Sequence, residues 1–177
     1  MRVVAGLYGG RRLVAPPGSA TRPTSDRVRE ALFSLLGPDV DGARVLDLYA
    51  GSGALGIEAL SRGAATAVFV DRSQQAIAAI KANLEALGIE ASVRRMEARA
   101  ALRPAPAGAD PYDLVFLDPP YRHAAGLGRE LSEALPAVLA PGGRVISESD
   151  RREPLELAFR LVDERRYGDT VIRIHEL

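Results

Sequence analysis

Short apolar runs alternate with helically spaced apolar positions along most of the chain, starting near residue 43. The runs predict buried strands over residues 43–49, 66–71, 92–97, 112–118 and 143–149. The helical spacing predicts helices over residues 52–63, 73–88 and 128–141, whereas residues 101–111, rich in Ala and Pro, predict a loop. Strands that alternate with helices form a mostly parallel sheet with helices on both faces. The sequence therefore predicts an α/β fold.

The two ends of the chain carry patterns of a different kind. Residues 2–15 predict a short hairpin with a Tyr-Gly-Gly turn, and residues 159–177 predict two strands around a Tyr-Gly-Asp turn. Thr24 or Ser25 caps a predicted helix over residues 27–36, which a Gly-Pro pair ends. We therefore expect an antiparallel hairpin at one edge of the sheet and a short N-terminal extension.

Composition is that of an ordinary globular protein. The 177 residues are 47% hydrophobic and 26% charged, with no cysteine and two histidines. We therefore expect one domain without disulfides or a metal site. No apolar run reaches the roughly 18–20 residues that cross a bilayer, and the N-terminus lacks the pattern of a signal peptide. These features favour a cytoplasmic monomer that does not bind membranes.

Charge is distributed unevenly, although the net charge is zero. The first 36 residues carry six arginines and only two acidic residues. Arginine suits bidentate contacts with phosphate groups, so this stretch predicts an anionic partner. A solvated arginine face is the alternative. We divide the chain into a basic extension, residues 1–36, and a larger domain, residues 37–177.

A glycine-rich loop follows the first predicted strand of the alternating pattern and opens the next helix. Gly51, Gly53 and Gly56 form the spacing G-x-G-x-x-G, in which glycine lets the backbone turn tightly and approach a ligand. Asp71 ends the next strand, where a carboxylate accepts hydrogen bonds from ribose hydroxyls. This order of elements predicts a nucleoside site, which a nicotinamide cofactor and S-adenosylmethionine would both fit.

Asp47 favours one of these two cofactors. It lies just before the glycine loop, where a carboxylate repels a pyrophosphate and attracts the ammonium group of a methionine. The position therefore favours S-adenosylmethionine over NAD. The alternative is that Asp47 only caps a backbone turn.

The segment Asp118-Pro119-Pro120-Tyr121 follows the strongly apolar strand 112–118, and ligands of open parallel sheets bind at such strand ends. The two prolines stiffen the backbone and remove two N–H donors. What remains is a ledge of acceptors that suits a substrate –NH₂ group. Tyr121 can stack on a flat base, a contact worth about 1–3 kcal/mol. The alternative is a structural turn capped by a packed tyrosine.

Taken together, DLYAGSGALGIEAL, Asp71 and DPPY resemble the class I S-adenosylmethionine-dependent amino-methyltransferases. The N-terminal RVVAGLYGGRRL and TRPTSDRVREALFSLL, with the late YGDT, are similar to the RsmD family, which methylates N2 of a guanine in 16S ribosomal RNA. The resemblance covers nearly the whole chain. It implies a Rossmann-like fold with a seven-stranded sheet. It also implies ribosomal RNA as the partner, within the small subunit or an assembly intermediate.

The resemblance also implies a role for each matching residue. Eight residues would bind the cofactor: Asp47, Tyr49, Gly51, Ser52, Gly53, Asp71, Glu97 and Ala98. Four would form the catalytic ledge: Asp118, Pro119, Pro120 and Tyr121. Five would contact RNA phosphates: Arg11, Arg12, Arg22, Arg27 and Arg29. Glu97 is equally compatible with a solvated side chain, and no general base is assigned.

Other functions remain open at this point. A DNA adenine-N6 methyltransferase would share the DPPY motif, but the short chain shows no target-recognition domain. A protein glutamine methyltransferase would not need the basic extension. A catalytically inactive RNA-binding module would have no reason to keep Asp47, Gly51, Gly53, Asp71 and Asp118 together. A nicotinamide oxidoreductase is opposed by Asp47 and by the acceptor ledge.

Overall fold

A sheet of seven strands forms the centre of the computed structural model, which describes residues 1–17, 25–103, 110–119 and 124–177. The strand order is β3-β2-β1-β4-β5-β7-β6. Five neighbouring strands are parallel: β1 (Arg44–Leu48), β2 (Thr66–Asp71), β3 (Ser92–Arg95), β4 (Tyr112–Leu117) and β5 (Leu139–Asp150). Two are antiparallel and end the sheet: β7 (Thr170–Glu176), beside β5, and β6 (Arg160–Tyr167). The predicted mostly parallel sheet with a C-terminal hairpin is confirmed.

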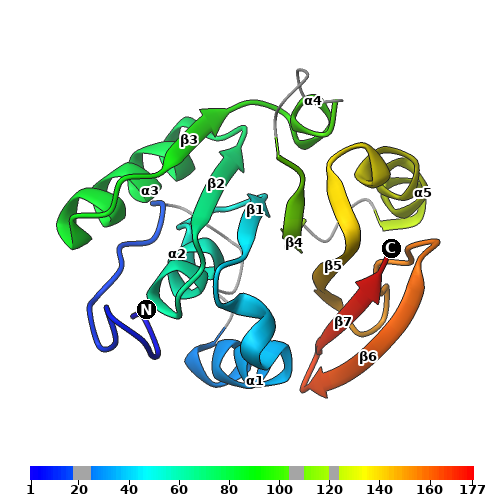
Figure 1. Ribbon diagram of the computed structural model, residues 1–177, viewed down its shortest axis with the longest axis horizontal. Helices are drawn as coiled ribbons and strands as arrows, with labels where there is room; N and C mark the ends of the chain where they lie inside the picture. The colour runs from blue at the N-terminus through cyan, green and yellow to red at the C-terminus, as the bar shows by residue number, and fades with distance from the viewer. Residues whose placement is uncertain (18–24, 104–109, 120–123) are drawn as a thin grey trace.

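Helices cover both faces of this sheet (Figure 1). Buried side chains of α1 (Asp26–Leu36), α2 (Ala54–Ser61) and α3 (Gln74–Leu87) form one core with alternate strand residues. Side chains of α4 (Ala98–Ala101) and α5 (Ala124–Ala134) form a second core with the remaining strand residues. The two cores arise because successive side chains of a strand point to opposite faces. In β1, for example, Val45 belongs to the first core and Leu46 to the second.

Local sequence accounts for the helix ends near the candidate site. Ser25, one of the two predicted caps, accepts a hydrogen bond from the backbone N–H of Val28 and begins α1. Ser73 caps α3 in the same way through Ala76, and Gly88 ends it with a left-handed φ of 67°. The caps define where α1 and α3 begin, and the buried side chains of both helices pack in the same core as those of α2.

Two predicted boundaries were wrong. The predicted loop 101–111 is preceded by the short helix α4, which already includes Ala101. The predicted helix 128–141 stops at Ala134, and a 3-10 turn (Leu135–Ala137) follows. Pro136 lacks the N–H that an α-helix needs, and Leu139 instead pairs with Tyr112 in the sheet.

The N-terminal segment, which we define as residues 1–15, lies along α2 (Figure 1). It forms a single antiparallel bridge, between Arg2 and Arg12, rather than two predicted strands. Its backbone N–H groups donate hydrogen bonds to side chains of α2 and α3, and further backbone hydrogen bonds form within the segment. Val3 and Leu13 are buried in the same core as α1–α3. The division at residue 36 thus stays a prediction about function, because this core spans both parts.

Candidate active site

The carboxyl ends of β1, β2 and β4 meet at one edge of the sheet. β1 lies between the other two and is parallel to both. Asp47 lies near the end of β1, Asp71 ends β2, and Asp118 directly follows β4. The structure thus brings together the three carboxylates that the sequence assigned to the cofactor and to catalysis.

The glycine loop turns as its residue types require. Gly51 and Gly53 have φ of 56° and 78°, and Tyr49 has a φ of 61°. Tyr49 is the sole non-glycine residue with positive φ in the described part of the chain. A Cβ on Gly51 would meet just the Tyr49 carbonyl oxygen, 3.9 Å away, so the protein leaves space beside this glycine. A loop of this shape leaves room for a ligand against its backbone.

Asp71 holds the start of this loop. Its Oδ2 accepts a hydrogen bond from the N–H of Gly51 at 2.9 Å, and its Oδ1 accepts one from Ser73 at 2.8 Å. A carboxylate offers about four acceptor positions, so these two bonds leave capacity for ribose hydroxyls. The carboxylate of Asp71, which is predicted to bind the ribose, is therefore already oriented by the protein.

Asp47 is 2% exposed, and its Oδ2 accepts a hydrogen bond from the N–H of Gly56 at 2.9 Å. Gly56 must lack a side chain here, because a Cβ would lie 2.4 Å from the ring of Phe69. Burial raises the pKa of Asp47 to about 7; the Gly56 bond opposes this rise, and the charge of Asp71 adds to it. Asp47 thus does bond a backbone N–H group, as the alternative interpretation expects. Its carboxylate also lies at the edge of the sheet where β1, β2 and β4 end.

Asp118 lies beside a carboxylate that the sequence analysis missed, Glu148 of β5. The register pairs Leu117 with Ser147, so Asp118 and Glu148 are neighbours on adjacent strands. Glu148 is 7% exposed. Burial raises the pKa of Asp118 well above its ordinary value, and the charges of Glu148 and Asp47 raise it further. An acidic residue at the end of the predicted strand 143–149 was the available signal for Glu148.

A cavity of about 150 Å³ lies between the end of β1 and helices α4 and α5. Tyr49, Glu97 and Ala98 line it, together with Leu127 and Leu131 of α5. Burial raises the pKa of Tyr49 to about 12, and the charge of Glu97 contributes. Three predicted cofactor residues thus share one cavity beside the glycine loop.

The predicted phosphate contacts divide into two groups. Arg11, Arg12 and Arg27 are exposed. Arg29 is 1% exposed, and its Nη2 donates to the carbonyl of Arg2 and to Asp26 at 2.5 and 2.7 Å. The prediction for Arg29 was wrong, because a buried guanidinium that bonds α1 to the N-terminal segment does not meet a surface phosphate.

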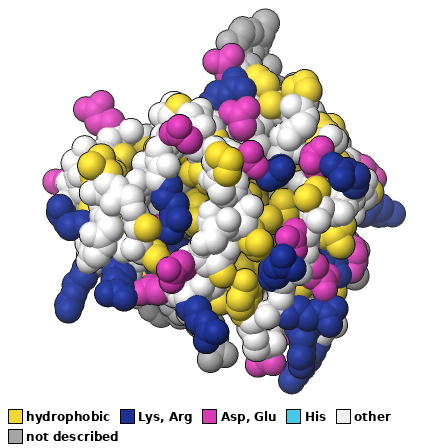
Figure 2. Space-filling model, turned by 60° about the horizontal axis from the view of Figure 1, so that its bottom comes forward, with side chains coloured by type: hydrophobic (Ala, Val, Ile, Leu, Met, Phe, Trp, Pro, Cys, Tyr) yellow, Lys and Arg dark blue, Asp and Glu magenta, His cyan; other side chains and the backbone are white. Residues whose placement is uncertain are grey.

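Some predicted site residues lie outside the described residues: Arg22, Pro120 and Tyr121. Pro119 is described and buried. Figure 2 shows one face of the molecule, on which acidic side chains are scattered and several basic side chains gather at the lower left and lower right. In the described part of the chain, no group of three or more His, Cys, Asp or Glu residues could hold a metal ion. The described helices also include none with the length and hydropathy of a membrane span.

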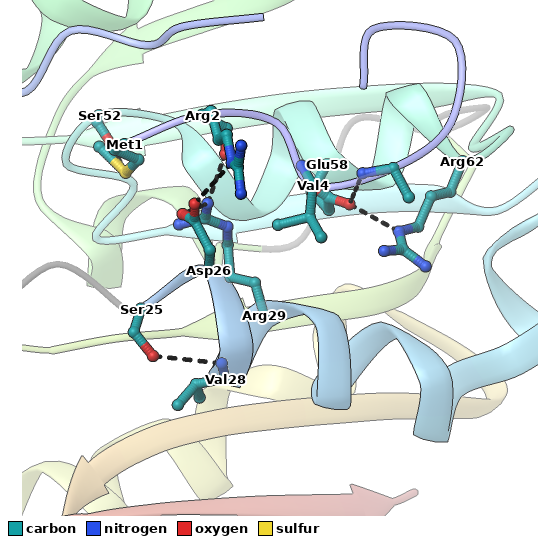
Figure 3. Close-up of polar contacts among 11 residues, drawn as sticks. Met1, Arg2, Val4, Ser25, Asp26, Val28, Arg29, Ser52, Glu58 and Arg62 are labelled. Carbon is teal, nitrogen blue, oxygen red and sulfur yellow. Dashed lines mark hydrogen bonds and ion pairs between the residues drawn. The ribbon is translucent and has the colours of Figure 1, made fainter. Parts of the chain in front are cut away.

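Buried polar contacts attach the N-terminal segment to α2 (Figure 3). Glu58 is fully buried and accepts hydrogen bonds from the N–H groups of Val4 and Ala5 and from Arg62. At the other end of α2, the Ser52 hydroxyl lies 3.6 Å from the sulfur of Met1. The backbone of this segment is therefore held in a defined position relative to the glycine loop.

Comparison with known proteins places this chain in a family. The model of the family described as "Conserved hypothetical protein 95" matches residues 1–176. The chain belongs to this family. Its relatives include YlbH of Bacillus subtilis, 41% identical over 99% of this chain and 98% of that protein. Ribosomal RNA small subunit methyltransferase D of Haemophilus influenzae is 31% identical over 99% of this chain and 93% of its own length. The resemblance to the RsmD family is confirmed.

A solved structure adds the fold class. The 16S rRNA N2 methyltransferase RsmC of Thermus thermophilus, solved with AdoMet and guanosine, superposes with a TM-score of 0.68. It is 27% identical, and the match covers 92% of this chain and 45% of RsmC. The predicted class I methyltransferase fold is confirmed.

Proposed function

We propose that this protein transfers a methyl group from S-adenosylmethionine to the exocyclic N2 amine of a guanine in 16S ribosomal RNA. The observation that carries the proposal is the placement of Asp118 directly after β4, because β4 is the neighbour of β1 and β1 leads into the glycine loop. A methyl donor on the loop and an amine on Asp118 would then be neighbours. The named function of the Haemophilus influenzae relative supports ribosomal RNA as the substrate.

The residues present fit the cofactor. Asp71 would accept hydrogen bonds from the ribose, with Gly51 and Gly53 against the methionine part. Tyr49, Glu97 and Ala98 line a cavity that would take the adenine. The cofactor supplies an electrophilic methyl group on a sulfonium. Its positive charge would favour the ionised forms of Asp47 and Asp118, whose pKa values are raised in the free protein.

Asp118 would accept hydrogen bonds from the guanine amine and orient its lone pair toward the methyl carbon. Such an amine is a weak nucleophile because its lone pair is delocalised into the ring, so orientation supplies much of the rate. Transfer would form an N–C bond as the S–C bond breaks, and the bonding pair would stay on the sulfur. The methylated nitrogen would then lose a proton to water.

RNA would approach over the N-terminal segment and the start of α1, where Arg11, Arg12 and Arg27 are exposed. Phosphate contacts of this kind position a nucleic acid without reading its sequence. The target guanine would leave its stack to reach Asp118. We propose that the protein acts as a cytoplasmic monomer on the small subunit or on an assembly intermediate.

A labelling experiment tests the proposal. The protein is incubated with labelled S-adenosylmethionine and separately with unmodified 16S ribosomal RNA, 30S particles, DNA and protein. We expect label on one guanine N2 of the ribosomal RNA, alone or in the particle. Label on adenine N6 or on a glutamine would contradict the proposal, and no transfer to any substrate would favour the inactive RNA-binding module.

A further inference from the structure

Asn83 of α3 connects the N-terminal segment to the glycine loop. Its side-chain Nδ2 donates to the carbonyl of Val14 at 3.0 Å and to the carbonyl of Ser52 at 2.9 Å. Its Oδ1 accepts a hydrogen bond from the N–H of Val14 at 2.8 Å. Asn83 is 2% exposed. One buried amide therefore joins two segments that are far apart in the sequence.

Only an amide satisfies this set of partners. The two hydrogens of Nδ2 meet two carbonyl oxygens, and Oδ1 meets one N–H group. A carboxylate at this position would present acceptors to both carbonyls, and an aliphatic side chain would remove all three hydrogen bonds. Because the Asn83 side chain itself is buried, its polar atoms depend on these partners, and the three bonds keep Val14 and Ser52 in a fixed relation.

The orientation of the loop depends on this contact. The N–H of Gly51 bonds Asp71, and the N–H of Gly53 bonds the Ala50 carbonyl at 2.6 Å. The carbonyl of Ser52 shares a peptide plane with the N–H of Gly53, so Asn83 fixes that plane from its other side. Asn83 lies behind the loop, on the helix side, and would not touch the cofactor itself.

A second connection also reaches the glycine loop at Ser52. Arg29 of α1 donates to the carbonyl of Arg2, and the sulfur of the preceding Met1 lies 3.6 Å from the Ser52 hydroxyl (Figure 3). The two segments that carry the proposed RNA contacts Arg11, Arg12 and Arg27 are thus both connected to the loop at Ser52.

We infer that Asn83 is a positioning residue that makes the N-terminal segment part of the cofactor site, so that RNA bound to the segment and cofactor bound to the loop strengthen each other. The RNA half of this inference rests on the proposed function. Linkage requires that the effect be reciprocal: the factor by which RNA raises cofactor affinity equals the factor by which cofactor raises RNA affinity.

The test compares Asn83→Ala with Leu87→Ala, which truncates a buried side chain of the same helix that makes no hydrogen bond to Val14 or Ser52. Binding of S-adenosylhomocysteine is measured by equilibrium dialysis, with and without unmodified 16S ribosomal RNA. We expect Asn83→Ala to weaken binding about tenfold, which corresponds to about 1.4 kcal/mol. We expect RNA to raise the affinity of the wild type about fivefold or more and that of Asn83→Ala less than twofold. Leu87→Ala should keep the wild-type affinity and the wild-type effect of RNA.

Val14→Pro gives a second route if Asn83→Ala does not fold. It removes the Val14 N–H from Asn83 and leaves the contact of Asn83 with Ser52 in place. We expect cofactor affinity without RNA to stay within about threefold of the wild type, with a reduced effect of RNA.

The outcomes separate this inference from the proposed function. Wild-type cofactor affinity in Asn83→Ala, or an equal loss in Leu87→Ala, would overturn the positioning role. A wild type that binds RNA without any change in cofactor affinity would overturn the coupling. A wild type that binds no ribosomal RNA would contradict the proposed function, and the cofactor affinity of Asn83→Ala would still decide the positioning role.

Discussion

The glycine loop and the ledge after β4 are neighbours, yet they are built on opposite principles. In the loop, two side chains hold the backbone by hydrogen bonds: Asp71 accepts one from Gly51, and Asn83 donates one to Ser52. At the ledge, Asp118 lies beside Glu148, and the charges of Glu148 and Asp47 disfavour ionisation of Asp118. The loop is therefore held by its own hydrogen bonds, whereas a cationic ligand would favour the charged form of Asp118.

Asp47 belongs to both regions. It bonds the N–H of Gly56 as the loop residues do, and its pKa is raised as that of Asp118 is. This double role explains how an acid next to a cofactor loop can favour a positively charged ligand, which relieves the repulsion among the carboxylates. Four variants test the difference between the two regions.

Asp118→Ala should have the largest effect, because it removes the proposed acceptor for the substrate amine. We expect methyl transfer to fall by at least about 10³-fold, while binding of S-adenosylhomocysteine stays within about threefold. Single-turnover kinetics and calorimetry measure the two quantities. Asp110→Ala, an exposed acid before the same strand, serves as the control with normal activity. Loss of cofactor binding together with activity would mean that Asp118 belongs to the cofactor region.

Asp47→Asn should change the pH dependence of stability. The pKa of Asp47 is about 7 in the folded protein against an ordinary value of 3.8. Between these values the unfolded chain has lost the proton that the folded protein keeps, so folding becomes less favourable as the pH rises from about 4 to 7. Asparagine can still accept from Gly56 and carries no charge. We expect Asp47→Asn to raise the free energy of unfolding by about 3 kcal/mol at pH 8 and to change it little at pH 4, as measured by urea unfolding. An equal effect at both pH values would show that ionisation of Asp47 is not the cause.

Asp71→Ala should act on the preformed loop. It removes the acceptor for Gly51 and the proposed ribose contact at once. We expect cofactor affinity to fall about 30-fold by calorimetry, which corresponds to about 2 kcal/mol. Glu90→Ala, an exposed acid that follows α3, is the control. Unchanged affinity in Asp71→Ala would remove this residue from the cofactor site.

Replacing Arg11, Arg12 and Arg27 together should have the smallest effect on chemistry, because these side chains lie outside both regions. Loss of three phosphate contacts should flatten the salt dependence of RNA binding by about two units of the log–log slope. The affinity for S-adenosylhomocysteine alone should stay unchanged. A slope equal to that of the wild type would move the RNA surface elsewhere on the protein.

Local patterns anticipated much of the site. The runs before Asp47, Asp71 and Asp118 predicted strands, and parallel strands bring such ends to one edge. Local patterns did not give the roles of three other residues. Arg29 was predicted to contact RNA, because the local sequence does not show that this arginine is buried. Glu148 and Asn83 matter through neighbours on other elements, which no spacing rule identifies.

The sequence by itself determined which residues form strands and helices, where the glycines permit a turn, and which carboxylates end the strands, because these properties depend on neighbours along the chain. Tertiary structure decided which charges share a buried space, and it placed the N-terminal segment against the loop at Ser52. Hydrogen bonds and electrostatic repulsion act between atoms a few ångströms apart, whatever their separation in sequence. For that reason only the folded chain shows that the hydrogen-bonded glycine loop lies beside a group of carboxylates whose charges raise the pKa of Asp118.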